Sequence, residues 1–251
     1  DLTGRQDDQQ PFEAFTVPVP VADPGPDGVP GSSDDGAPIT AYQVSADRVG
    51  LPPLNVTRNI PDTRNEDWTF ELSATRRLSG RWSMTADFSH LWTHDNASGY
   101  LGQPVRANAV PVTPNDFIHA DDNGRHVFRV WSAKVFGTVA APWGISVTPM
   151  LRHQSGQPFG RTIVAALNYS RSVRILAEPI GTRRMDAVTV LDVRVEKSLP
   201  RLLRHSSVFV DVFNALNANP ATTISWSSDA FQRPLTIMSP RIVRLGVRIV
   251  W

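Results

Sequence analysis

The sequence predicts an all-β chain of antiparallel strands, and three observations support this prediction. Apolar and polar residues alternate over many segments, glycine and proline collect between those segments, and helical periodicity is nearly absent. The 21 prolines and 16 glycines crowd into four stretches, at 18–38, 50–62, 102–114 and 156–160. We expect eight strands, at about 12–22, 66–78, 81–93, 125–140, 143–155, 187–198, 206–217 and 241–251.

The composition excludes several classes of protein. The chain is 41% hydrophobic and 20% charged, which is typical of a folded protein. Its net charge of +1 argues against nucleic acid as a partner. The absence of cysteine excludes disulfides, thiolate metal sites and thiol catalysis. Because the sequence also has no Gly-x-Ser-x-Gly elbow and no phosphate-binding loop, we do not expect an enzyme.

The last twelve residues, PRIVRLGVRIVW, show the clearest alternation. Successive side chains of a strand point to opposite faces. One face is apolar, and it carries Val243, Leu245, Val247, Ile249 and Trp251. The other face holds two arginines. A soluble sheet with one wet face gives the same alternation, so the pattern alone leaves open whether the apolar face meets a protein core or lipid.

The spacing of tryptophans favours lipid. Trp82 and Trp92 lie ten residues apart on one face of the strand 81–93, which corresponds to a height of roughly 25 Å at about 3.3 Å per residue and a tilt of about 40°. Barrels of the bacterial outer membrane have an apolar band of about that height between two aromatic girdles. We therefore expect five membrane-interface aromatics, which are Trp68, Trp82, Trp92, Trp131 and Trp143.

The connections between the predicted strands alternate in length. Outer-membrane barrels have short periplasmic turns and longer extracellular loops, and the same alternation is expected here. A sheet in lipid has to close, because every backbone group there must find a partner. Eight strands are enough for a small closed barrel, and the chain also fits as one part of a larger barrel. The short turns fall near 79–80, 141–142 and 199–205, and the long connections at 23–65, 94–124, 156–186 and 218–240.

Four segments resemble the TonB-dependent receptors of bacterial outer membranes. The terminal PRIVRLGVRIVW, with Val247, Ile249 and Trp251, is similar to the signal that the outer-membrane assembly machinery recognises. VFVDVFNALNANPAT at 208–222 resembles the penultimate barrel strand, which ends in a Phe-Asn pair. RHQSGQPFGR at 152–161 resembles a strand-to-loop passage of these barrels. ADPGPDGVPGSSDDG at 22–36 resembles a loop of the Oar-like receptors that carry a carboxypeptidase-regulatory-like domain.

The resemblance implies a barrel of about 22 strands with a plugged lumen, in the bacterial outer membrane. Residues 1–251 would be the C-terminal segment of that barrel, without a plug domain. The implied function is energised uptake of a ligand. The implied partners are the lipid bilayer, the rest of the barrel and its plug, the TonB complex and the outer-membrane assembly machinery. The alternative is a self-contained eight-stranded barrel with a structural or adhesive role.

One loop partly matches a calcium site. With Asp23 at position 1, Asp27 falls at position 5 and Asp34 at position 12, where calcium loops place oxygen ligands. Gly28 falls at position 6, where such loops turn, but Gly25 leaves position 3 without a ligand. The alternative is a solvated turn rich in proline, glycine and aspartate. No other cofactor is expected.

The charged residues of the polar strand faces also have two interpretations. Asp192, Arg194 and Glu196 share one face of their strand, as do Arg244 and Arg248 on the last strand. Cross-strand ion pairing is the expected role of these groups, and a catalytic pair of carboxylates is the alternative.

Overall fold

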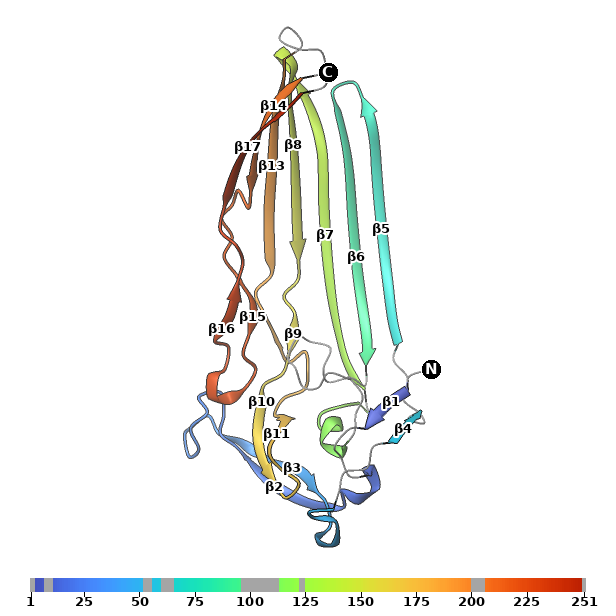
Figure 1. Cartoon of the computed structure of the whole chain (residues 1–251), viewed down its shortest axis with the longest axis vertical. Helices are drawn as coiled ribbons and strands as arrows, with labels where there is room; N and C mark the ends of the chain where they lie inside the picture. Colours follow the sequence, from blue (N-terminus) through green and yellow to red (C-terminus); the bar gives the residue numbers. More distant parts are fainter. Residues whose placement is uncertain are drawn as a thin grey trace.

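In the computed structural model, the described residues are 3–6, 11–51, 56–59, 66–95, 113–121, 125–199 and 206–249. They form antiparallel β-strands and five short 3-10 helices, and they contain no α-helix, so the all-β prediction is confirmed. Seven strands make the main sheet, in the spatial order β17-β14-β13-β8-β7-β6-β5 (Figure 1). Within the described ranges, no helix has the length and apolarity that a membrane crossing requires.

The main sheet contains seven of the eight predicted strands. Most of their bounds agree with the alternation to within two residues, and the largest differences are in the last two strands. The strands are β5 (Glu66–Ser79), β6 (Trp82–Asp95), β7 (His126–Ala141), β8 (Ile145–Gln154), β13 (Val188–Ser198), β14 (Ser207–Phe213) and β17 (Ile242–Arg248).

The predicted strand at 12–22 does not belong to the main sheet, which corrects that expectation. Residues 12–14 form the 3-10 helix η1 (Phe12–Ala14), and β2 (Val17–Asp23) pairs with β3 (Gly36–Gln43) in a separate two-stranded sheet. Pro18 and Pro20 lie inside β2 and cannot donate backbone hydrogen bonds. Strands with internal prolines are confined to sheet edges, and among the described strands β2 pairs with β3 alone.

The short and long connections lie at opposite ends of the main sheet (Figure 1). At the short-turn end, Gly80 has φ 70°, the left-handed conformation that a two-residue turn between β5 and β6 requires. The 3-10 helix η4 (Pro142–Gly144) makes the turn between β7 and β8. Pro149 lies within β8, and the register of β8 against β7 is the same on both sides of this proline, with a gap in the pairing opposite Pro149 itself.

The long connections fold into a second unit, which we call the cap: residues 11–51, 113–121, 156–186 and 218–240. It contains four small two-stranded sheets and η1, together with the 3-10 helices η2 (Ala46–Arg48), η3 (Pro114–Phe117) and η5 (Ser228–Ala230). The remaining cap strands are β9 (Pro158–Phe159), β10 (Thr162–Leu167), β11 (Ser170–Leu176), β12 (Arg183–Arg184), β15 (Ala221–Ile224) and β16 (Pro234–Ile237). Beside it, β1 (Thr3–Gln6) pairs with β4 (Val56–Asn59).

The buried apolar core of the described residues lies mainly in the cap. Its largest cluster joins the β2–β3 and β10–β11 hairpins through seven buried residues, which are Ile39, Ala41, Ile163, Ala165, Leu167, Val173 and Ile175. A second cluster packs Phe159 and Trp226 with stacked rings 5.9 Å apart. The cap is therefore a packed structure of its own, and the sequence had indicated only long connections there.

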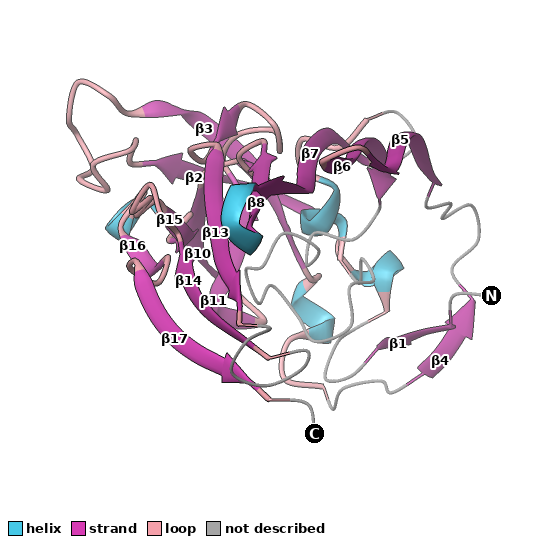
Figure 2. Ribbon diagram, turned by 90° about the horizontal axis from the view of Figure 1, so that it is seen from above, coloured by secondary structure: helices cyan, strands magenta, loops and turns pink. Residues whose placement is uncertain are grey.

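The main sheet bends into an arc (Figure 2). Its two edge strands, β5 and β17, do not pair with each other, so the sheet stays open in the described part of the chain. It has one apolar and one polar face along most of its length. The apolar face is the one that carries Trp82 and Trp92, and the polar face is the one that carries Arg194 and Asp211.

Candidate functional site

The apolar face of the main sheet is continuous and exposed. Cross-strand partners lie on the same face of a sheet, and one row of such partners runs across six strands. The row consists of Trp82, Val139, Val147, Val195, Val210 and Leu245. Leu245 is 77% exposed and Val139 is 49% exposed. Exposed apolar surface on this scale is typical of an interaction with lipid or with a partner protein.

The tryptophans lie near the two ends of this face. Trp68 and Trp92 are direct partners near the cap end of β5 and β6, and Trp131 of β7 is the partner of His90. Trp82 begins β6 at the short-turn end. Trp143 lies in the turn between β7 and β8, is 82% exposed and has φ 61°. A left-handed conformation is uncommon for so bulky a residue, and here it lies at an exposed turn.

The polar face carries a row of cross-strand ion pairs. Arg194, Asp211 and Arg244 are direct partners on β13, β14 and β17. Arg194 donates from Nε to Asp211 Oδ1 at 2.6 Å, and Arg244 donates from Nη2 to Asp211 Oδ2 at 2.6 Å. The pairing expected from the sequence is confirmed for these residues. One carboxylate between two guanidinium groups leaves the row with a net positive charge.

The same pairing extends to the other charged residues that the sequence placed on this face. Arg152 donates to Asp192 at 2.9 Å, and Arg248 lies 3.4 Å from Glu196. The carboxylates of Asp192 and Glu196 each pair with an arginine, and the two groups serve different cross-strand pairs. The interpretation as a catalytic pair of carboxylates therefore gains no support from the arrangement.

Asn214 directly follows β14, at the position where the Phe-Asn pair was expected to end a strand. Its φ of 51° turns the chain out of the sheet directly after Phe213. Its backbone N–H donates to Asp192 Oδ1 at 2.8 Å, and its side-chain amide donates to the carbonyls of Ala218 and Ser239. The strand predicted to reach residue 217 stops at 213 because Asn214 makes this local network instead of a ladder.

In the cap, a buried arginine connects segments that are far apart in the sequence. Arg161 donates to both carboxylate oxygens of Asp23, to Ser228 Oγ at 2.8 Å and to Glu178 Oε1 at 3.3 Å. Glu178 also accepts from Arg183 Nε at 2.7 Å. The side chains of Arg161 and Asp23 are only 4% and 5% exposed. The network thus joins β2, the residue that precedes β10, η5, β12 and the segment between β11 and β12.

These contacts shift the pKa values of the cap carboxyl groups. The hydrogen bond from Arg161 holds the pKa of Asp23 below its usual value of 3.8. Burial alone would raise the pKa of Glu178, but the hydrogen bonds and charges of Arg183 and Arg161 outweigh it and leave that pKa below 4.5. Both carboxylates are therefore ionised at neutral pH, and their charges are matched by two arginines.

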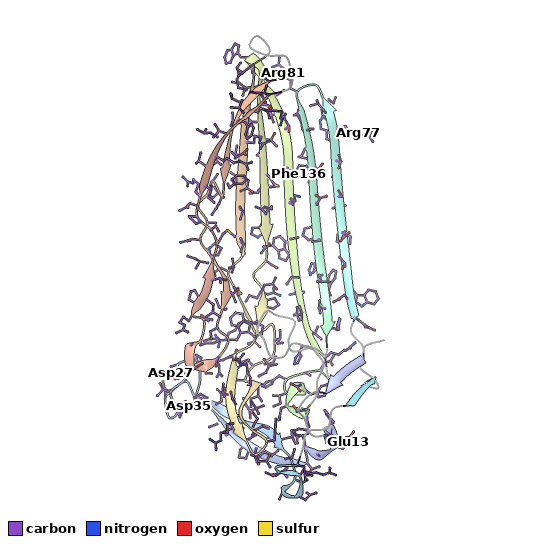
Figure 3. The ribbon with its side chains drawn as sticks, viewed as in Figure 1. Glu13, Asp27, Asp35, Arg77, Arg81 and Phe136 are labelled. Atoms are coloured by element: carbon purple, nitrogen blue, oxygen red, sulfur yellow. The ribbon has the colours of Figure 1, made fainter. Side chains whose placement is uncertain are left out.

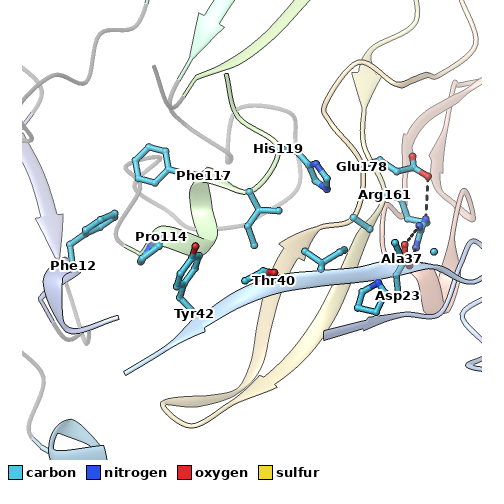
Figure 4. Close-up of a pocket in the computed structure, with 15 residues that line it drawn as sticks. Phe12, Asp23, Ala37, Thr40, Tyr42, Pro114, Phe117, His119, Arg161 and Glu178 are labelled. Carbon is cyan, nitrogen blue, oxygen red and sulfur yellow. Dashed lines mark hydrogen bonds and ion pairs between the residues drawn. The ribbon is translucent and has the colours of Figure 1, made fainter. Parts of the chain in front are cut away.

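A pocket of about 900 Å³ lies above β3, between η3 and the β10–β11 hairpin (Figure 4). Its aromatic end contains Phe12, Tyr42 and Phe117, and its charged end contains Arg161 and Glu178. The rings of Phe12 and Phe117 meet edge to face, with centroids 5.8 Å apart. Pockets of this size hold small molecules. This one offers apolar contacts at one end and hydrogen-bonding groups at the other.

The aspartates of the proposed calcium loop do not come together around one point. Asp23 pairs with Arg161, whereas Asp27 and Asp34 both accept from the hydroxyl of Ser32. Asp34 also accepts from the backbone N–H of Asp27 at 3.2 Å. Among the residues described, no group of three or more His, Cys, Asp or Glu side chains is arranged to hold a metal ion. The observed geometry is that of a hydrogen-bonded turn.

Two residues of the expected assembly signal are described. Val247 lies in β17 opposite Val208, on the apolar face, and is 65% exposed. Ile249 directly follows β17 and is 52% exposed. Trp251 lies outside the described residues.

Sequence reasoning missed the Arg161 network and the pocket. Arg161 and Asp23 are 138 residues apart, and no local pattern links such distant positions. The sequence offered one weak indication of a special role for Arg161. It directly follows a Pro-Phe-Gly segment, within a stretch where helices and strands were not expected. No protein-family model, no curated protein and no solved structure matches the chain.

Proposed function

We propose that this chain forms part of the wall of an outer-membrane β-barrel and serves a TonB-dependent receptor in the energised uptake of a ligand. The observation that carries the proposal is the main sheet, whose apolar face is exposed across its width while its polar face carries cross-strand ion pairs. Lipid outside and a polar interior inside would satisfy both faces. The segments that resemble TonB-dependent receptors favour this class of barrel.

The open sheet favours a large barrel over the self-contained alternative. Seven strands form the sheet in the described residues, and the expected eighth strand lies in the cap. A sheet in lipid must close to pair its backbone groups, so β5 and β17 each require a further strand. In the proposed receptor, the rest of the barrel would supply both neighbours.

The cap fits the outer end of such a receptor. It is built from the long connections, and outer-membrane barrels place their long loops outside the cell. Its pocket of about 900 Å³ gives an imported ligand a site to bind before passage through the barrel. Because the charged end of the pocket is internally neutralised, the site would favour a ligand with both apolar surface and neutral polar groups.

The proposal is tested by comparing the source bacterium with two deletion strains, one without this gene and one without TonB. Untargeted profiling of the spent medium would show which compounds each strain removes. We expect a compound that the parent removes and that both deletion strains leave in the medium. Uptake profiles that are unchanged by loss of this gene, or changed by it but not by loss of TonB, would contradict the proposal.

A further inference from the structure

The hairpin of β5 and β6 separates its charges along its length. Residues 74–86, around the turn, contain three arginines and no acidic residue. The remaining parts, 66–73 and 87–95, contain five acidic residues and no lysine or arginine. Figure 3 shows Arg77 and Arg81 at the short-turn end of the sheet and Glu13, Asp27 and Asp35 at the cap end. The overall charge of +1 therefore conceals a basic region at the short-turn end.

The arginines at this turn make no ion pair with any described residue, whereas Arg194 and Arg244 of the polar face and Arg161 of the cap each pair with a carboxylate. Arg76 instead lies over the ring of Trp82, with 4.0 Å between the guanidinium carbon and the ring centroid. Leu78, in the same turn, is 67% exposed. We call Arg76, Arg77, Leu78, Arg81 and Trp82 the turn patch.

The turn patch borders the apolar face of the sheet. Arg76 is the direct partner of Met84, which shares a face with Trp82. A guanidinium over an indole ring keeps its in-plane N–H donors available for an oxygen anion. Phosphate oxygens suit these donors, because arginine binds phosphate with parallel, charge-assisted hydrogen bonds. An anion bound there would have apolar side chains directly beside it.

We propose that the turn patch binds the phosphodiester headgroup of an anionic phospholipid in the membrane leaflet at the short-turn end. The arginines contact the phosphate, while Trp82 and Leu78 contact the glycerol and the upper acyl chains. This arrangement matches the general chemistry of membrane interfaces, where aromatic rings and basic side chains meet the headgroups. The proposal rests on the proposed membrane location of the main sheet. It adds a lipid site that also orients the chain in the bilayer.

The test uses the complete protein in which this chain is a wall segment, in vesicles of phosphatidylcholine with and without phosphatidylglycerol. Native mass spectrometry then measures the ratio of the two lipids that stay bound. The variant R76Q/R77Q/R81Q removes the basic part of the turn patch. The matched control, R48Q/R171Q/R233Q, removes the same charge from exposed positions in the cap. A third variant, R76K/R77K/R81K, keeps the charge of the turn patch and loses its planar donors.

We expect phosphatidylglycerol to be enriched on the native chain and on the cap control. Each arginine removed from the turn patch should reduce that enrichment about fivefold, and the lysine variant should keep an intermediate enrichment. Insertion without a preference for phosphatidylglycerol, or an equal loss in the cap control, would overturn the lipid site and leave the barrel proposal intact. Failure to insert into either vesicle would overturn both. Displacement of the lipid by an oligonucleotide at matched phosphate concentration would assign the patch to nucleic acid instead.

Discussion

Phe209 of β14 lies against Gly246 of β17, its direct cross-strand partner, and its ring fills the space that a side chain at position 246 would need. The guanidinium of Arg194 stacks on the same ring, 4.3 Å from its centroid. The glycine therefore has a packing role in the last strand of the sheet. It leaves room for an aromatic ring from the neighbouring strand on the polar face.

Substitution of this glycine should loosen the attachment of β17. Gly246→Ala places a methyl group against the Phe209 ring and should destabilise the sheet by about 1–3 kcal/mol. Denaturant unfolding in detergent would measure the loss. Phe209→Ala removes the ring, so the double variant should recover part of the loss in a double-mutant cycle. Strict additivity of the two single changes would show that the ring and the glycine do not interact.

The buried ion pair of the cap should be important for local stability. Arg161→Met leaves the carboxylate of Asp23 buried without its partner, which should destabilise the cap by about 3–5 kcal/mol. Hydrogen exchange of the β10–β11 amides would report the change. Arg48→Met is the control, because Arg48 and Asp47 form a pair with side chains 46% and 75% exposed, and such pairs contribute about 0–1 kcal/mol. Equal protection in both variants would contradict the role of Arg161.

Acid should open the cap, because the carboxyl groups of buried Asp23 and half-buried Glu178 have lowered pKa values. The stabilisation from Asp23 and Glu178 is fully present above their usual values of 3.8 and 4.5. It is lost as the pH falls through the lower pKa values of the folded state. Limited proteolysis can be measured from about pH 3 to about pH 6, a range that includes the usual pKa values of carboxyl groups. Cleavage within the cap should increase at the acid end of this range. In D23N/E178Q this pH dependence should largely disappear, and its persistence would assign the transition to other groups.

Substitutions on the two faces of β17 should impair folding to different extents. Val247→Arg places a charge on the apolar face and should impair folding into lipid by up to about 2–4 kcal/mol, the cost of an arginine at the bilayer midplane. Arg248→Val removes a charge from the polar face, where it pairs with Glu196 across exposed surface, so its effect should be small. Folding yields in vesicles would separate the two. Equal effects would show that the apolar face does not meet lipid.

Alternation predicted the strands of the main sheet because their two faces meet different surroundings along most of their length. It overestimated β14, since Asn214 adopts a left-handed conformation that the pattern of apolar residues does not reveal. Alternation also wrongly predicted that β2 belongs to the main sheet, because Val17, Val19 and Val21 alternate with other residues as they would in a strand of a large sheet. β2 lies in the cap because it pairs with β3. The sequence of one strand does not show which other strand it pairs with.

The candidate site was less predictable than the sheet. The tryptophans of the apolar face and the ion pairs of the polar face follow from the period of a strand, which is local. The cap depends on contacts between distant segments, such as Asn115, whose side chain binds both backbone groups of Tyr42 from 73 positions away. Such contacts arise from the packing of loops, and no periodic pattern encodes them.

In the proposed barrel wall, the apolar face of the main sheet meets lipid and the polar face meets water. The chain has no cysteine, so a fluorophore attached to one introduced cysteine labels a single position. Five variants, each with one cysteine in place of Val243, Arg244, Leu245, Val247 or Arg248, are labelled with a polarity-sensitive fluorophore and measured in vesicles. We predict blue-shifted emission that is quenched by nitroxide-labelled acyl chains at 243, 245 and 247. At 244 and 248, an aqueous quencher should reach the probe instead. Quenching from water at all five positions, or the reverse alternation, would contradict the account.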